Sequence, residues 1–178
     1  DLDEGIAYRI GRAYAAFLNA KTVAVGRDIR LTSDSIASEL VRGLTDSGVD
    51  VIDIGIGGTE MVYFATFHYG LDGGIMVTAS HNPPNYNGMK MVRDGSKPIS
   101  EASGLKEIRA IAESNEFRTA ENPGRVEQRD VMNDYIGHLL TYVDPSRIKP
   151  LKVVVTAGNG CAGPIIDRLE PHLPLEFI

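Results

Sequence analysis

The sequence contains a single cysteine, fewer basic than acidic residues and no long apolar run, and each of these features argues against a class of protein. Cys161 alone cannot build the disulfide framework of a small secreted domain, and it fits a reducing compartment. No apolar stretch approaches the roughly 20 residues of a membrane-spanning helix, and no signal-peptide pattern opens the chain. The net charge of -6 argues against nucleic acid or an anionic membrane as a partner. The expected location is the cytoplasm.

Apolar residues are plentiful enough for one sizeable core. The 178 residues are 43% hydrophobic and 24% charged, as in an ordinary soluble globular domain. An acidic protein can still carry a cationic pocket, so the composition leaves a phosphate-bearing substrate open.

Hydrophobic periodicity predicts alternating strands and helices through the first half of the chain. The first helix is expected to bury Ile6, Ile10 and Phe17 and to point Arg9 and Arg12 outward. Helices are predicted over residues 4–19, 34–46 and 60–69, and strands over residues 21–26, 49–55 and 74–80.

Loop lengths predict how these strands pair. The connections between the first three strands leave room for right-handed crossovers, so those strands should be parallel. The strand after residue 88 follows a connection too tight for a crossover and should run antiparallel. We therefore expect an α/β fold with three layers: a mixed, mostly parallel sheet with one antiparallel strand and helices on both faces.

The rest of the chain predicts a second, incomplete unit. Helices are expected over residues 103–113 and 130–142, separated by a connecting segment without clear periodicity, and prolines 145 and 150 bracket a linker. A strand, a helix and a strand are expected over residues 151–156, 164–169 and 175–178. We predict a first domain over residues 1–143, and a linker with the start of a second, similar domain over residues 144–178.

The most specific string is Thr78-Ala-Ser-His-Asn-Pro-Pro-Asn-Tyr-Asn-Gly88, here called the serine loop. It follows a predicted strand and offers the Ser80 hydroxyl, the His81 imidazole and, just beyond it, the Lys90 ammonium. A nucleophile among cations at the carboxyl end of a parallel strand suits phosphate chemistry. A plain turn is the alternative, because Asn, Pro, Gly and Ser are ordinary turn residues.

Two arginines follow the first predicted strand in Gly26-Arg27-Asp28-Ile29-Arg30. Arg27 and Arg30 are candidates for bidentate bonds to a phosphate. The alternative, which we prefer, is that Asp28 holds one of them in a structural ion pair.

Three other functions compete with this interpretation, and one that stays open is a non-catalytic scaffold or regulatory domain. A Ser80–His81 hydrolytic pair is disfavoured, because adjacent residues on an extended segment point to opposite faces. Gly158-Asn-Gly160-Cys-Ala-Gly163 matches the dinucleotide fingerprint between a strand and a helix, so a dinucleotide-binding domain stays open. A simple strand-to-helix turn is the preferred interpretation there, because Pro171 ends the helix early.

The serine loop resembles the active-site loop of the alpha-D-phosphohexomutase family. Residues 25–30 resemble the family's Gly-x-Asp-x-Arg element, and residues 57–66 resemble its bacterial phosphomannomutase branch, which feeds GDP-mannose synthesis. Thr59-Glu60 stands where many relatives have Thr-Pro, and the similarity covers most of the chain.

The resemblance implies a phosphoserine at Ser80 that exchanges phosphate with a hexose phosphate through a hexose 1,6-bisphosphate. The expected reaction interconverts mannose 6-phosphate and mannose 1-phosphate, with a phosphoglucomutase or a dual-specificity enzyme as the alternative. His81 would bind phosphoryl oxygens, Lys90 would assist proton transfer, and Asn82 would contact phosphate with the two arginines. The family also implies Mg²⁺ between the phosphate on Ser80 and three aspartates of the second domain.

Several family elements are missing from residues 1–178. These are the N-terminal tyrosine- and arginine-bearing loop, the aspartate-rich metal loop, the sugar-recognition loop and the C-terminal phosphate-binding domain. We therefore expect the chain alone to lack mutase activity and to bind Mg²⁺ poorly. The sequence gives no indication of the oligomeric state.

Overall fold

A computed structural model describes residues 2–178, which divide into two compact units. The first unit extends to Arg129 and the second comprises Asp130–Ile178. The two units thus divide between residues 129 and 130, whereas the predicted domain boundary lies between residues 143 and 144. That domain boundary stays a prediction.

The first unit is built on one mixed six-stranded sheet in the order β5-β4-β3-β1-β2-β6. Its strands are β1 (Thr22–Arg27), β2 (Asp50–Ile56), β3 (Gly73–Val77), β4 (Met89–Arg93), β5 (Lys97–Pro98) and β6 (Val126–Gln128). Strands β3, β1, β2 and β6 pair in parallel, whereas β4 is antiparallel to both of its neighbours. The prediction of a mostly parallel sheet with one antiparallel strand is confirmed.

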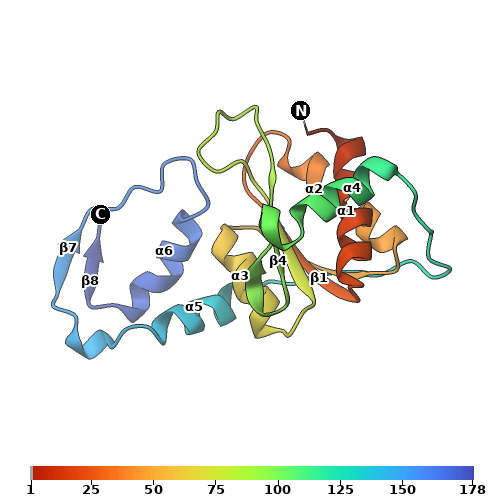
Figure 1. Cartoon of the computed structure of the whole chain (residues 1–178). Coiled ribbons are helices and arrows are strands. Elements are labelled where there is room, and N and C mark those ends of the chain that lie inside the picture. Colours follow the sequence, from red (N-terminus) through yellow and green to blue (C-terminus); the bar gives the residue numbers. More distant parts are fainter. Residues whose placement is uncertain (1) are drawn as a thin grey trace. The chain divides into compact units, whose positions relative to one another are not determined.

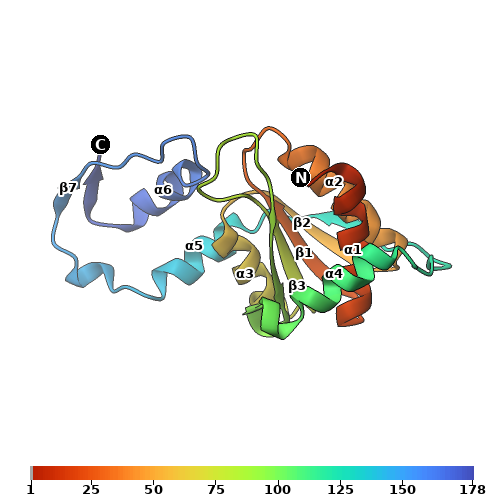
Figure 2. The same cartoon turned by 45° about the horizontal axis from the view of Figure 1, so that its top comes forward.

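Helices cover both faces of this sheet, as Figures 1 and 2 show. One face carries α1 (Glu4–Leu18), α2 (Ser33–Asp46) and α4 (Leu105–Ser114), and the other carries α3 (Thr59–His68). Short 3-10 turns, η1 (Asp94–Ser96) and η2 (Glu101–Ser103), flank β5. The three-layer arrangement follows from two crossovers, in which α2 joins β1 to β2 on one face and α3 joins β2 to β3 on the other.

Alternate residues of the central strands feed the two layers of the core. The side facing α1 and α2 buries strand residues Val23, Val25, Val51, Ile75 and Val77. Each such side chain contributes about 1.5–3 kcal/mol when fully buried. The Tyr14 hydroxyl ties α1 to this sheet by donating to the Val92 carbonyl at 2.5 Å, and burial raises the pKa of this phenol.

Helices α1 and α2 approach each other through glycines. A Cβ at Gly11 would lie 2.5 Å from the Leu40 carbonyl oxygen, and one at Gly43 would lie 2.2 Å from the Tyr8 oxygen. Any larger residue at either position would therefore push two backbones apart.

Arg12 corrects one prediction for this helix pair, because it is buried rather than outward-facing. Its guanidinium donates to the Tyr8 hydroxyl and to the Arg118 carbonyl, at 2.8 and 2.9 Å. It also lies over the ring of Phe117, 5.1 Å from the centroid. The sequence pattern was misleading because segment 115–124, which has no helical or strand period, covers this side of α1.

The two edge strands of the sheet, β5 and β6, were not predicted, because neither has an apolar pattern of its own. β6 lies inside the segment expected to be a mere connection, and its three residues are exposed. It forms because β2 offers a free edge for pairing, and next to this edge the Arg125 amide donates to Asp50 Oδ1 at 2.7 Å. Gly124 allows the approach, since a Cβ there would lie 1.9 Å from the Val49 oxygen.

The second unit contains the predicted strand, helix and strand. It comprises α5 (Met132–Leu140), η3 (Pro145–Arg147), β7 (Leu151–Val153), α6 (Gly163–Leu169), η4 (Glu170–His172) and β8 (Leu175–Phe177). β7 and β8 pair in parallel, and β7 ends at Val153 rather than at Thr156. Across residues 2–178 no helix is both long and apolar enough to cross a membrane.

The close approach of α1 and α2 predicts that Gly11→Ala lowers the free energy of unfolding by about 1–3 kcal/mol, because the new methyl group overlaps the backbone of α2. Gly5→Ala in the same helix is the control, since its Cβ would have 3.5 Å of room and should be neutral or slightly stabilising. Urea unfolding of both variants measures the difference. Equal effects of the two substitutions would contradict the account of the helix contact.

Candidate active site

The candidate site lies where the carboxyl ends of neighbouring strands β1 and β3 meet. β1 leads into residues 28–32 before α2, and β3 leads into the serine loop. The Asp28 amide donates to the Val77 carbonyl at 3.1 Å, so the two segments leave the sheet side by side. This edge of a parallel sheet is where ligands bind in α/β folds.

Ser80 lies just past β3, which ends at Val77, and its side chain is exposed. Its backbone is left-handed, with a φ of 52°, instead of the extended conformation that was expected. The turn brings the Ser80 hydroxyl to 2.9 Å from Nδ1 of His81. The argument that adjacent side chains must diverge was therefore wrong at this position, because it assumed an extended backbone. With Nδ1 unprotonated, the hydroxyl donates this hydrogen bond and the imidazole nitrogen accepts it.

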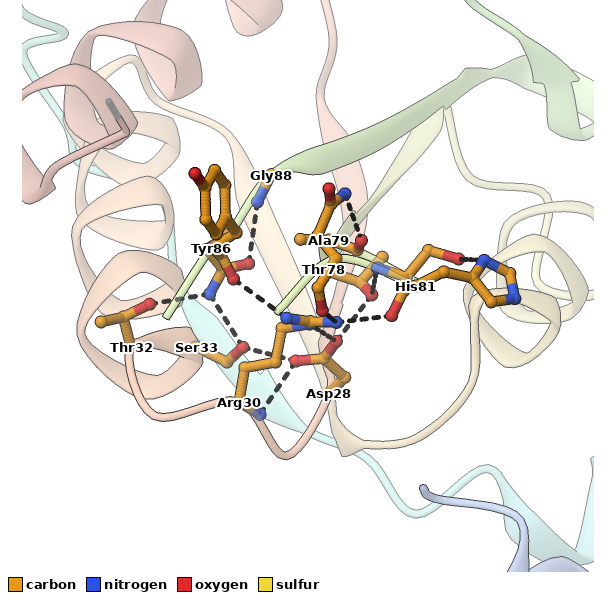
Figure 3. A network of polar contacts seen from close by, with 12 residues as sticks. Asp28, Arg30, Thr32, Ser33, Thr78, Ala79, His81, Tyr86 and Gly88 are labelled. Atoms are coloured by element: carbon orange, nitrogen blue, oxygen red, sulfur yellow. Dashed lines mark hydrogen bonds and ion pairs between the residues drawn. The ribbon is translucent and has the colours of Figure 1, made fainter. Parts of the chain in front are cut away.

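Asp28 is the centre of a polar network beneath the serine loop (Figure 3). Its carboxylate accepts from the Ser33 and Thr78 hydroxyls, both at 2.6 Å. It also accepts from the backbone amide and Nε of Arg30, at 3.1 and 3.2 Å. The Thr78 hydroxyl in turn accepts from the Ser80 amide at 3.0 Å. Asp28 therefore connects the end of β1, the start of α2 and the start of the serine loop.

The Arg30 guanidinium lies within the serine loop (Figure 3). Besides Asp28, its acceptors are four carbonyls of the loop, those of Ser80, Asn82, Pro83 and Tyr86. The structural pair with Asp28, the preferred interpretation from the sequence, is present. The role of Arg30 as a phosphate ligand stays a prediction.

Two asparagines complete the shape of the serine loop. The Asn87 amide donates to the hydroxyls of Thr32 and Ser33, at 3.1 and 3.0 Å, which fixes the far end of the loop on the start of α2. The Asn82 amide donates to the Ala79 carbonyl at 2.8 Å and closes the turn around Ser80. A contact between Asn82 and phosphate stays a prediction.

Sequence reasoning gave Thr78, Ser33 and Asn87 no place in the site. Small polar residues at strand ends and helix starts were the available signal, because they commonly bond to nearby loops. Their partners could not be read from the sequence, since they lie about 50 residues away along the chain.

Arg27 and Lys90 stand apart from this network. Arg27 pairs with Asp34 of α2 and with Asp53 of β2, the latter at 3.3 Å, beside a cavity of about 200 Å³. Lys90 lies on β4 opposite Met76 and is exposed, and its ammonium forms no hydrogen bond or ion pair with residues 2–178. Its ammonium is free to meet a ligand, and the roles predicted for both residues stay predictions.

The glycine-rich turn of the second unit gives no support to dinucleotide binding. The last glycine of that fingerprint normally allows close helix–strand packing, yet a Cβ at Gly163 would meet no atom within 4 Å. Helix α6 is also only seven residues long.

No group of three or more His, Cys, Asp or Glu side chains within residues 2–178 is arranged to hold a metal ion. The metal-binding residue predicted here was Ser80 alone, through a phosphate. That role of Ser80 stays a prediction.

Known proteins of one family are similar to this chain over its whole length. Residues 1–119 match the family model described as phosphoglucomutase/phosphomannomutase, alpha/beta/alpha domain I. The chain is 53% identical to a phosphomannomutase of Vibrio cholerae and 51% identical to one of Escherichia coli K12, over its whole length and 41% of theirs.

A solved structure gives the same result. The fold superposes on a phosphoglucomutase/phosphomannomutase family protein of Burkholderia thailandensis with a TM-score of 0.85 and 35% identity, over 99% of this chain and 40% of that one. The chain therefore spans about two fifths of the length of these relatives. It belongs to the phosphoglucomutase/phosphomannomutase family, the alpha-D-phosphohexomutases.

Proposed function

We propose that the protein containing this chain is a phosphomannomutase that interconverts mannose 6-phosphate and mannose 1-phosphate through a phosphoserine at Ser80. The observation that carries this proposal is the exposed Ser80 hydroxyl, in contact with His81 and held at the carboxyl ends of β1 and β3. The identity of 53% to the Vibrio cholerae phosphomannomutase over the whole chain supports it.

The reaction consists of two successive phosphoryl transfers, one from Ser80 to the sugar and one from the sugar back to Ser80. In the first, the bond between phosphorus and the Ser80 oxygen breaks while the oxygen of a sugar hydroxyl bonds to phosphorus, and the proton that this hydroxyl loses restores the Ser80 hydroxyl. The resulting hexose 1,6-bisphosphate reverses its orientation in the site and returns its other phosphoryl group to Ser80. Added hexose 1,6-bisphosphate would act as an activator, because it phosphorylates an unmodified serine.

Positioning and charge neutralisation supply most of the catalysis in phosphoryl transfer. A phosphoserine carries a charge of about -1.5 to -2 near neutral pH. Lys90 has the free ammonium to meet this charge and to assist proton transfer at the sugar hydroxyl. The His81 imidazole, already at the serine oxygen, would bind the phosphoryl oxygens.

Mg²⁺ is part of the proposal. A phosphoryl oxygen on Ser80 would be its ligand from this chain, and carboxylates outside residues 2–178 would supply the others. The ion would neutralise phosphate charge when bound. The isolated chain is accordingly proposed to be inactive and to bind Mg²⁺ weakly.

A dual-specificity phosphohexomutase is the second candidate. A relative from Xanthomonas campestris that is 50% identical over the whole chain is named for phosphohexose mutases in general. Phosphoglucomutase activity falls within this alternative, and assays with glucose 1-phosphate and mannose 1-phosphate separate the two.

The cytoplasm and a role in GDP-mannose synthesis complete the proposal. The single cysteine and the acidic net charge agree with this setting and with a hexose phosphate, rather than nucleic acid or a membrane, as the partner.

The first prediction from this proposal is that Ser80→Ala in the complete protein lowers kcat by roughly 10⁴-fold or more, because a nucleophile cannot be replaced. Ser35→Ala on the exposed side of α2 is the matched control and should leave turnover unchanged. Coupled assays of mannose 1-phosphate turnover measure both. Full activity of the Ser80 variant would refute the proposal.

His81→Ala and Lys90→Ala are each expected to lower kcat by about 10²- to 10⁴-fold, the usual contribution of a positioned proton-transfer or charge-stabilising group. Lys106→Ala on the exposed face of α4 controls for the loss of a lysine. Turnover near the wild-type value in either variant would remove that residue from the mechanism.

A further inference from the structure

We propose that Arg30 is a positioning residue that holds the Ser80 nucleophile in place, and that it is not a ligand of the transferred phosphate. The inference rests on the proposed function, because it concerns the geometry of the serine that carries the phosphoryl group. It assigns Arg30 to the backbone of the serine loop and names Asp28 as its anchor.

The hydrogen bonds of Arg30 account for every donor of its side chain. A guanidinium has five N–H groups. Nε donates to Asp28 Oδ2, Nη1 donates to the Pro83 and Tyr86 carbonyls, and Nη2 donates to the Ser80 and Asn82 carbonyls. The side chain is 11% exposed. A phosphate could bind Arg30 only by displacing one of these acceptors, and among the four carbonyls only that of Pro83 has a second donor, the Tyr86 amide at 3.0 Å.

The arrangement of the acceptors explains why an arginine is required. Four backbone carbonyls, that of Ser80 and three that follow it in the loop, converge on one planar cation, so their dipoles would repel one another without it. The two terminal nitrogens reach residues 80 and 82 on one side and residues 83 and 86 on the other. Lysine has a single nitrogen with three donors and cannot bridge these pairs.

Asp28 fixes the orientation of the Arg30 guanidinium by accepting a hydrogen bond from its Nε. The hydroxyls of Ser33 and Thr78 hold the Asp28 carboxylate from α2 and from the end of β3. The carboxylate is 16% exposed and balances the charge of the guanidinium. The position of the serine loop is thereby set by the junction of β1 and α2, which belongs to the rigid part of the fold.

The backbone of Ser80 needs such a constraint. A left-handed conformation is disfavoured for a residue with a Cβ, so surrounding contacts must hold it. Arg30 constrains it by donating to the Ser80 carbonyl, and the Thr78 hydroxyl constrains it by accepting from the Ser80 amide. Loss of the constraint would move the hydroxyl away from the point where phosphorus is attacked.

The test compares Arg30→Lys with Arg109→Lys in the complete protein. Arg109 lies on the exposed side of α4, paired with Glu113, and serves as the matched control. Amide hydrogen exchange of residues 79–88 and the kinetic constants for mannose 1-phosphate are measured on both variants.

We expect Arg30→Lys to accelerate exchange in residues 79–88 at least tenfold and to lower kcat by roughly 10²-fold, since a shift of about 1 Å in a reacting group can cost that much. KM should change less than threefold, and the control should match the wild type. Unchanged hydrogen exchange in the loop would overturn the proposal. A raised KM with unchanged kcat would also overturn it and would identify Arg30 as a phosphate ligand.

A measurement on the wild-type protein keeps the proposal testable if Arg30→Lys does not fold. The Nη protons of Arg30 should give slowly exchanging NMR signals, and phosphorylation of Ser80 should leave them in place. Signals that are absent, or that shift to those of a phosphate-bound arginine, would contradict the proposal. Loop exchange needs no activity, so a failure of the proposed function, seen as an active Ser80→Ala variant, is recognised separately.

Discussion

The ion pair between Asp28 and Arg30 is the interaction on which the candidate site depends. It places one cation where four loop carbonyls converge, and one carboxylate where two hydroxyls and a backbone amide converge. Neither charge would be stable in this partly buried place without the other. The pair thus links the serine loop to the end of β1 and supports Ser80.

The rest of the first unit supplies the rigid frame for this pair. The strands that lead to Asp28 and to Ser80 are neighbours in the middle of the sheet, with their apolar residues buried by helices on both faces. The start of α2 contributes Ser33, and it is fixed because α2 packs closely on α1 through Gly11 and Gly43. The loop therefore inherits its position from the core, while the Ser80 hydroxyl, His81 and Lys90 stay exposed to a substrate.

Much of this fold could be predicted from the sequence, because its strands and helices have clear apolar periods and its crossover lengths determine which strands are parallel. The edge strand β6 could not, since its pairing with β2 rather than its own pattern creates it. The burial of Arg12 was missed because the covering segment has no period. At the site, the motif identified Ser80, but the left-handed turn and the convergence of Thr78, Ser33 and Asn87 on one network depend on tertiary contacts.

The central claim is that the network centred on Asp28 holds a serine that carries the transferred phosphate. Peptide mass mapping of the complete protein, after incubation with hexose 1,6-bisphosphate, tests this claim most directly when wild type and Asp28→Asn are compared. The account predicts one phosphate on the wild-type peptide that contains Ser80, and a much slower appearance of that phosphate in the variant. Phosphate on a different peptide, or equal rates in the two proteins, would contradict it.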